Sequence, residues 1–249
     1  MLFTDADCAP TLTWIEEMLK PFADSHVSAV KGAYLTQQNE PLAIFCQYEF
    51  EQKYKNLLKS KYIDFIDTYS AGVKREVFFL VGGFSERFKT PSCEDCEFAY
   101  RLVEHGYKIV FNPNARVYHQ HPTHWLKYLR RKFRFGLCRA YVIFEHRTQS
   151  FRDTYTLPQL KLQIILFYLF VMGLIFTIKS KVFLGLSLGA IITLMLTDIK
   201  LIIKILRERP RVGIYAPFYL ILRALGLSTG LAIGLCLIIL KKIMQFMKR

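Results

Sequence analysis

Acidic side chains are scarce in the second half of this 249-residue sequence. Residues 122–249 contain only four Asp and Glu residues against 21 Lys and Arg, whereas residues 1–121 contain 16 acidic and 13 basic residues. The hydrophobic fraction is 52% and the mean hydropathy is +0.21, which is high for a soluble protein. Long apolar spans flanked by cations are typical of a protein that contacts anionic lipids. We therefore expect a near-neutral soluble half, a basic half that contacts membrane lipids, and no nucleic-acid partner.

A disulfide framework is also lacking. The six cysteines have no regular spacing along the chain, and only Cys93 and Cys96 form a CxxC pair. Such a pair can supply half of a zinc or redox site, but no second CxxC pair and no pair of histidines completes it. Two acidic residues also lie between the two cysteines. We therefore assign no metal or redox role to this pair.

Residues 1–121 alternate between strand-like and helix-like patterns. The expected strands cover residues 1–4, 27–35, 107–111 and 115–119, with a further strand or loop at 67–73. The expected helices cover residues 11–19, 42–58 and 75–80, with a fourth that follows an acidic cluster and ends at His105 and Gly106. Pro21 is expected to stop the first helix, and Gly32 is expected to interrupt the strand that contains it. The alternation predicts an α/β layer structure.

Two groups of acidic residues stand at the ends of these elements. Asp5 and Asp7 follow the first strand, and Glu94, Asp95 and Glu97 lie at the start of the fourth helix. Backbone N–H groups at a helix N-terminus stabilise carboxylates, so capping alone would account for the second group. The presence of a first group after a strand favours a functional site instead.

Residues 3–119 contain a series of short motifs in a fixed order. The motifs are Phe3–Asp7 (FTDAD), Gly72–Phe78 (GVKREVF), Val81–Glu86 (VGGFSE), Cys93–Asp95 (CED) and Gly106–His119. In this order they resemble the DxD strand, the acceptor-side motifs and the closing strand of family 2 glycosyltransferases with the GT-A fold. The resemblance covers about residues 1–121, and the basic membrane tail resembles the membrane-anchored branch of that family. It implies a Rossmann-like catalytic domain that uses a nucleotide-sugar donor and inverts the anomeric carbon.

The resemblance implies that Asp5 and Asp7 bind Mg²⁺ or Mn²⁺. Two carboxylates at a strand end can hold such a cation through oxygen and leave positions for water and for the donor's diphosphate. By resemblance Asp7 is the direct ligand, and Asp5 lies nearer the ribose or the metal shell. His119 stands where relatives have a histidine near the metal, although a lone histidine is more often structural. His121 and His124 are weaker candidates.

The resemblance assigns the catalytic base to Asp95, with Glu94 as its neighbour. A second carboxylate nearby raises the pKa of the base, which favours removal of a proton from the acceptor hydroxyl. Gly82 and Gly83 belong to an acceptor-side motif and are expected to contact substrate. Many relatives have Asp where Glu97 stands, so any role for Glu97 is left open.

The nucleotide-binding portion of the GT-A domain is not found in this sequence. The resemblance implies a longer segment before the DxD strand, which forms the pocket for the nucleotide base, but here only Met1 and Leu2 precede Phe3. We therefore expect residues 1–121 to be the C-terminal part of the domain, or a partner chain to supply the missing half. The chain alone is expected to have little or no transferase activity. The alternative is a non-catalytic membrane subunit that partners a glycan synthase.

Residues 122–158 are expected to form a basic amphipathic helix and a linker. Between Trp125 and Phe144 apolar residues recur at spacings of three and four, and cations occupy the same turns. This pattern predicts a helix on the bilayer surface with its cations toward lipid phosphates. The segment RKFRF faintly resembles the Q-x-x-R-W box of processive polysaccharide synthases. Arg131 or Arg134 is therefore also a candidate for contact with the donor diphosphate.

Residues 159–249 contain three apolar spans long enough to cross a membrane. They cover about residues 162–178, 182–198 and 215–240. The first two spans are joined so tightly at residues 179–181 that they predict a helical hairpin, and the cations between residues 200 and 211 predict a cytoplasmic loop. Arg223 costs about 2.5–3.5 kcal/mol at a bilayer centre, so we expect it to snorkel or to lie at the interface. Two or three crossings both remain open.

Three glycines recur every four residues in the last span, at Gly226, Gly230 and Gly234, and predict a close-packing helix face. Together these features predict an integral protein of the plasma (inner) membrane with its catalytic domain in the cytoplasm. A lipid-linked or polysaccharide acceptor of the cell envelope suits that location. A small transporter is disfavoured because the spans carry few polar residues for a pathway.

Overall fold

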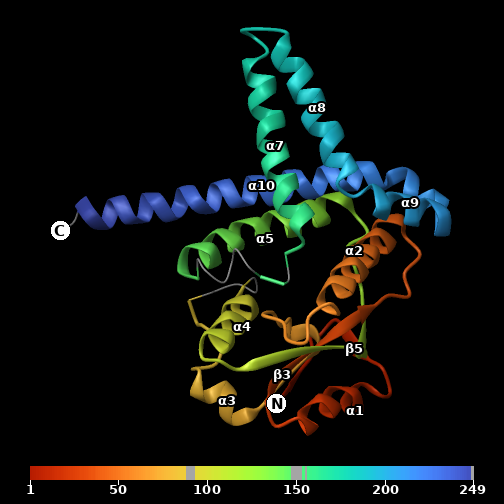
Figure 1. Ribbon diagram of the computed structural model, residues 1–249, viewed down its shortest axis with the longest axis vertical. Helices are drawn as coiled ribbons and strands as arrows, with labels where there is room; N and C mark the ends of the chain where they lie inside the picture. Colours follow the sequence, from red (N-terminus) through yellow and green to blue (C-terminus); the bar gives the residue numbers. More distant parts are fainter. Residues whose placement is uncertain (88–92, 147–152, 155, 248–249) are drawn as a thin grey trace. The chain divides into compact units, whose positions relative to one another are not determined.

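The computed structural model describes residues 1–87, 93–146, 153–154 and 156–247 (Figure 1). The chain divides into two compact units. The first, which we call the α/β unit, comprises Met1–His121 and Val142–Tyr155. The second, the helical unit, comprises Pro122–Tyr141 and Thr156–Arg249. Each unit has its own internal packing.

The α/β unit is built on a mixed sheet of five strands. The strands are β1 (Leu2–Phe3), β2 (Cys8–Pro10), β3 (Val27–Leu35), β4 (Ala71–Val73) and β5 (Lys108–His119). Their order across the sheet is β1-β4-β3-β5-β2. β3 and β5 are parallel and lie side by side in Figure 1, whereas the other neighbouring pairs are antiparallel. β3 is buried along almost its whole length, as expected of a central strand covered on both faces.

Gly32 lies within β3, which continues through it, but the pairing of β3 with β5 shifts register between Lys31 and Ala33, so the expected interruption is found in the ladder and not in the strand. The strand passes so close to its neighbours that a Cβ atom at Gly32 would lie 2.0 Å from Ser70 Oγ and 2.2 Å from the Ala115 carbonyl oxygen. Glycine is therefore required here for close packing between backbones and not to end the strand.

The last strand, β5, is one element and not the two pieces expected on either side of Asn112 and Pro113. Its pairing with β3 jumps from Phe111 to Arg116. The intervening residues form an irregularity in the ladder, and such a bulge accommodates a proline, which has no N–H to donate.

Helices in the α/β unit follow the expected segments. They are α1 (Trp14–Leu19), α2 (Pro41–Leu57), α3 (Arg75–Leu80) and α4 (Glu94–Glu104). α1 begins at Trp14 instead of Thr11, and it continues as the 3₁₀ turn η1 (Lys20–Ala23), which contains Pro21 at its start. A second 3₁₀ turn, η2 (Thr68–Ser70), leads into β4. α4 ends as expected before Gly106, whose φ of +83° is typical of a helix C-terminus.

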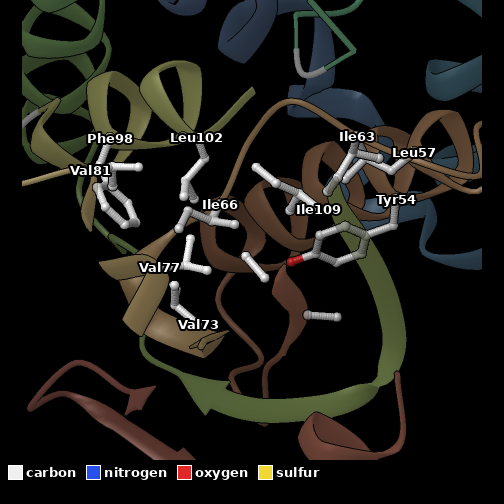
Figure 2. Close-up of a cluster of buried hydrophobic side chains, with 13 residues drawn as sticks. Tyr54, Leu57, Ile63, Ile66, Val73, Val77, Val81, Phe98, Leu102 and Ile109 are labelled. Carbon is white, nitrogen blue, oxygen red and sulfur yellow. The ribbon is translucent and has the colours of Figure 1, made fainter. Parts of the chain in front are cut away.

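The main hydrophobic core collects side chains from α2, α3, α4, β4 and β5 (Figure 2). Phe98 and Leu102 of α4 and Ile109 of β5 are fully buried in it. Full burial of each such side chain contributes about 1.5–3 kcal/mol to folding. The core therefore holds α4 firmly against the sheet, and with it the acidic first turn that carries Glu94 and Asp95.

Within the α/β unit, hydrogen bonds connect Asp153 and Thr154 to residues of the first 121 positions. The Tyr100 hydroxyl donates to Asp153 Oδ2 at 2.9 Å. The buried Asp64 carboxylate accepts from the Thr154 N–H at 2.9 and 3.0 Å and from the Thr154 hydroxyl at 2.7 Å. Part of the expected linker, residues 147–152 and residue 155, lies outside the described residues.

The helical unit contains the C-terminal helices and most of α5. Its elements are α5 (Trp125–Glu145), α7 (Pro158–Phe176), α8 (Val182–Leu196), α9 (Ile199–Glu208) and α10 (Pro210–Met247). Among the described residues, two helices, Pro158–Phe176 and Pro210–Gln245, are long and apolar enough to cross a membrane. α8 and α9 reach that length only together, with a bend of 55° between them. The loop expected after residue 200 is largely the helix α9, because Leu201, Ile202 and Ile205 are buried along one side.

The expected hairpin of α7 and α8 is confirmed (Figure 1). Gly173 of α7 lies against Ser187 of α8, whose hydroxyl donates to the Phe170 carbonyl oxygen at 3.1 Å. This bond satisfies a hydroxyl that would otherwise lack a partner in an apolar setting.

The close-packing face predicted at Gly226, Gly230 and Gly234 is also confirmed, and its partner is α5. A Cβ atom at Gly230 would lie 2.1 Å from the Phe133 carbonyl oxygen, and one at Gly136 of α5 would lie 2.2 Å from the Leu227 carbonyl oxygen. Backbones can approach this closely only where side chains are absent. One face of α5 is therefore covered by α10, a contact that the prediction of a bilayer-surface helix did not include.

Arg223 does not snorkel, so that part of the expectation is wrong, and its place at the membrane interface stays a prediction. Its side chain is 2% exposed and forms an ion pair with the buried Asp198. Arg223 Nη2 also donates to Gln163 Oε1 at 2.7 Å, and Gln163 Nε2 donates to Asp198 Oδ2 at 2.9 Å. Pairing and hydrogen bonding offset the cost of burying the cation, so it needs no route to the interface.

Candidate functional site

Asp7, Cys8 and His119 lie together at the β2 edge of the sheet. β2 pairs with the end of β5, and Cys8 and His119 are direct partners in that register. Cys8 Sγ lies 3.7 Å from His119 Nδ1 and 3.8 Å from Asp7 Oδ1. His119 Nδ1 lies 3.6 Å from Asp7 Oδ2. These three side chains form a group that can hold a metal ion.

The imidazole of His119 is held in place by aromatic stacking. Its ring stacks on Tyr34 with the centroids 4.3 Å apart, and Tyr34 stacks in turn on Tyr69 at 3.4 Å. His119 is buried, whereas the Asp7 side chain is 63% exposed. The stack fixes the plane of the imidazole while its Nδ1 edge faces the other two groups, so the histidine is oriented before any ligand arrives.

The chemistry of the donors in this cluster fits a divalent cation. A carboxylate oxygen, an imidazole nitrogen and a thiol sulfur are all metal ligands in proteins. Burial, followed by the negative charges of Asp7 and Asp5, raises the pKa of the Cys8 thiol to about 12. The same negative surroundings attract a cation.

Glu94 and Asp95 occupy the first turn of α4. Asp95 Oδ1 accepts from the Cys96 N–H at 2.7 Å, and Glu94 Oε2 accepts from the Cys93 N–H at 3.0 Å. Burial, followed by the negative charge of Glu94, raises the pKa of Asp95 to about 7. The carboxyl group can therefore both hold and release a proton near neutral pH.

Asp5 and Lys31 belong to the same charged region as Asp95. The negative charge of Asp5 raises the pKa of Asp95, and the positive charge of Lys31 lowers it. Asp5 Oδ1 accepts from the Thr68 hydroxyl at 3.2 Å. Lys31 is buried in β3 and forms an ion pair with Asp67. Acidic residues that are far apart in the sequence therefore act on one another through space.

Gly82 and Gly83 form the turn that ends α3. Their φ angles of +85° and +63° lie in the region that L side chains rarely adopt. Arg101 of α4 donates to the Val81 carbonyl oxygen and, at 2.6 Å, to that of Gly83. The same guanidinium donates to the buried Glu97 at 2.5 and 2.8 Å. The turn is thus attached to α4, and the substrate contact expected of the two glycines stays a prediction.

Of the remaining sequence candidates, His121 lies beside the site, with its ring centroid 5.0 Å from that of His119. His121 is buried, and its Nε2 lies 3.0 Å from Gln47 Oε1, which gives it a structural partner. His124 Nδ1 accepts from the Leu126 N–H at 3.2 Å at the start of α5. Arg131 and Arg134 lie on α5 in the helical unit. Their contact with a donor diphosphate therefore stays a prediction.

Sequence reasoning missed three features of this site. Cys8 directly follows Asp7, and that adjacency was the available signal. Lys31 is a charged residue inside an otherwise apolar strand, which indicates a buried ion pair. Glu97 and Arg101 are four residues apart, the spacing of side chains that meet on one helix face.

Comparison with known proteins identifies the family. A model of the family described as glycosyl transferase family group 2 matches residues 65–228, which is more than half of the chain. The chain belongs to this family. The matched residues include Asp95 and His119 and begin after Asp5 and Asp7. The family resemblance drawn from the sequence motifs is therefore confirmed.

Two curated relatives show the kind of protein to which the chain is similar. The O-antigen chain rhamnosyltransferase WbaN of Salmonella anatum is 35% identical over 116 residues, which cover 43% of this chain and 36% of that protein. The pre-mycofactocin glycosyltransferase of Mycobacterium tuberculosis is 26% identical over 150 residues, which cover 58% of this chain and 32% of that protein. The chain spans about a third of the length of these relatives.

Among solved structures, the mannosyltransferase PcManGT from Pyrobaculum calidifontis, in complex with GDP-Man and Mn²⁺, is similar at 17% sequence identity. The alignment covers 91% of this chain and 61% of that one, with a TM-score of 0.45. GDP-Man and Mn²⁺ are ligands of that mannosyltransferase.

Proposed function

We propose that this protein is an inverting glycosyltransferase that moves a sugar from a nucleotide-sugar donor to a membrane-associated lipid or polysaccharide acceptor. Family membership supports sugar transfer in general, and similarity to an O-antigen rhamnosyltransferase supports a glycan of the cell envelope. The observation that carries the finer proposal is Asp95, which has a pKa of about 7 and shares a charged region with Asp5.

In this proposal, Asp7 and His119 hold Mg²⁺ or Mn²⁺, with Asp5 in the surrounding shell. When bound, the cation neutralises the diphosphate that leaves the sugar. The Asp7 carboxylate is exposed, and the stacked imidazole of His119 keeps its Nδ1 beside that carboxylate. The two side chains therefore need little rearrangement to bind together.

Asp95 acts as the general base. It accepts the proton of the acceptor hydroxyl as that oxygen attacks the anomeric carbon from the face opposite the diphosphate. The new carbon–oxygen bond forms while the bond to the diphosphate breaks, and the bonding electron pair leaves with the diphosphate. Attack from the opposite face inverts the configuration, and a pKa near 7 suits a base that works near neutral pH.

The remaining expectations complete the proposal. Gly82 and Gly83 line the acceptor side, and Arg131 or Arg134 contacts the donor diphosphate. The candidate spans anchor the protein in the plasma (inner) membrane with the α/β unit in the cytoplasm. The exposed cations of α9 and of the start of α10 support that orientation, because cytoplasmic segments are enriched in Lys and Arg.

The substitution Asp95→Asn tests the proposal because it keeps the size of the side chain and removes the base. We expect kcat to fall by about 10²–10⁴-fold, with membrane insertion and circular dichroism unchanged. The measurement is release of nucleoside diphosphate in native membrane vesicles supplied with nucleotide sugars, which retain any partner chain that the unchanged protein needs for transfer.

The matched control is Asp24→Asn, which changes an exposed carboxylate in the turn before β3 and is expected to leave the rate unchanged. Transfer by the Asp95→Asn variant at the rate of the unchanged protein would contradict the proposal and favour a non-catalytic subunit that partners a glycan synthase.

A further inference from the structure

Beside the two metal-binding side chains of the proposed function stands a third, Cys8, that the proposed reaction does not use. Its sulfur lies 3.7 Å from His119 Nδ1 and 3.8 Å from Asp7 Oδ1. Backbone pairing between β2 and β5 fixes Cys8 opposite His119, so the sulfur and the imidazole are brought together by the sheet itself. A thiol in this position changes which metal ions the cluster prefers.

The separation between the sulfur and the imidazole nitrogen is close to that of a tetrahedral zinc site. Bonds of about 2.0–2.1 Å from Zn²⁺ to nitrogen and oxygen, and about 2.3 Å to sulfur, place neighbouring donors about 3.3–3.6 Å apart at tetrahedral angles. Cys8 Sγ and His119 Nδ1 are 3.7 Å apart. Asp7 approaches them with different oxygens, Oδ1 at 3.8 Å from the sulfur and Oδ2 at 3.6 Å from the nitrogen, so its exposed side chain must move to bring one oxygen to a shared ion.

The kinds of donor atom also favour zinc over the harder cations. Mg²⁺ requires near-octahedral oxygen ligands, whereas this cluster offers oxygen from Asp7 alone. Thiolate and imidazole ligands select Zn²⁺ over Mg²⁺ and Mn²⁺. Three protein ligands leave a fourth position open, which is the arrangement of zinc sites that bind a water or a substrate oxygen.

We propose that Cys8 is a third ligand of this site and that Asp7, Cys8 and His119 together hold Zn²⁺ more tightly than Mg²⁺ or Mn²⁺. The inference rests on the metal role that the proposed function gives to Asp7 and His119. It concerns metal selectivity and not sugar transfer, so the two can be tested separately.

The test uses the full chain in detergent, with Co²⁺ as a spectroscopic substitute for Zn²⁺. Bound Co²⁺ is expected to show a thiolate-to-cobalt charge-transfer absorption, and one equivalent of Zn²⁺ is expected to abolish it by displacement. The nearly isosteric substitution Cys8→Ser should remove this absorption. It should also weaken Zn²⁺ binding by about 100-fold or more, since loss of even an outer-shell partner costs 10–100-fold, and leave Mn²⁺ affinity within about threefold.

The matched control is Cys236→Ser, which removes an exposed free thiol in α10 and is expected to keep both the absorption and the affinity. His119→Ala should lose the absorption although it keeps Cys8. Absence of charge transfer in the unchanged protein, or unchanged Zn²⁺ affinity in Cys8→Ser, would overturn the inference. Neither result depends on turnover, whereas the Asp95→Asn assay depends on turnover alone, so failure of one proposal is distinguishable from failure of the other.

Discussion

The α/β unit and the helical unit treat charge in opposite ways. In the α/β unit, Asp5, Glu94 and Asp95 act on one another, and the nearby cation Lys31 is already paired with Asp67. In the helical unit, the buried Arg223 and Asp198 neutralise each other. The first group shifts the pKa of Asp95 to a value at which the carboxyl group exchanges protons near neutral pH, whereas the buried pair holds helices together. A shifted pKa in a charged cluster thus points to function, and a buried ion pair points to structure.

The largest expected effect comes from breaking the neutral pair. Asp198→Ala leaves Arg223 buried with its countercharge removed, and loss of one partner of a buried pair costs about 3–5 kcal/mol of stability. The measurement is the free energy of unfolding in detergent micelles, obtained by titration with a denaturing detergent.

The double variant Asp198→Ala with Arg223→Met is the control for this effect, because it removes both charges and keeps an apolar side chain of similar length. It is expected to recover most of the lost stability. If the double variant is as unstable as Asp198→Ala alone, the stability lost in Asp198→Ala does not come from an unpaired Arg223. The contrast drawn between the two units would then be wrong.

A smaller effect is expected where α5 and α10 meet through their backbones. Gly230→Ala places a Cβ atom 2.1 Å from the Phe133 carbonyl oxygen, and such overpacking costs about 1–3 kcal/mol. Gly189→Ala in α8 meets no atom within 4 Å and should be neutral or stabilise the helix by up to about 1 kcal/mol. Thermal unfolding of the two variants compares them, and equal transition temperatures would show that this contact does not hold the helical unit together.

A further expected effect is a pH dependence of the stability of the α/β unit. The pKa of Asp95 is raised in the folded state, to about 7 from an ordinary value of 3.8, so between these values the folded state binds more protons than the unfolded state. Stability therefore falls as pH rises from about 4 to about 7 and is flat above that range.

Hydrogen exchange of the β3 amides, corrected for the intrinsic exchange rate, measures this dependence as the opening free energy of the unit. The Asp95→Asn variant should lose the slope. A slope that persists in that variant would assign the titration to another group.

Local elements of the fold were predictable from the sequence. The periodic apolar residues of α2 and α4 and the tight turn between α7 and α8 depend on neighbours in the chain, and the structure has all three. The glycine spacing in α10 likewise predicted a packing face, because small residues at every fourth position lie on one side of a helix. The sequence did not indicate that α5 is its partner.

Predictions failed where the outcome depended on distant residues. Gly32 suggested the end of a strand, but β3 continues through it with a register shift against β5, and Ser70 and the Ala115 backbone make it a point of close packing. Arg223 suggested snorkelling, but Asp198 and Gln163 supply its partners. In both cases the prediction followed from the residue type alone, whereas the observed contacts are made with residues that are distant in the sequence.

In the candidate site, too, some residues were predictable from the sequence and others only from the structure. Asp7, Asp95 and His119 were named from motifs that resemble those of the family in their order along the chain. Cys8 entered the site only through the pairing of β2 with β5, since strand register and not adjacency in sequence places its sulfur against the imidazole.

The amino-acid sequence by itself determined the family, the position of most helices and strands, and the uneven distribution of charge between the two halves. The tertiary structure decided which charges are neutralised and which donor atoms meet. The physical reason is range: helix periodicity and turn chemistry act over a few residues, whereas burial, ion pairing and strand register depend on groups that only the folded chain brings within a few ångströms.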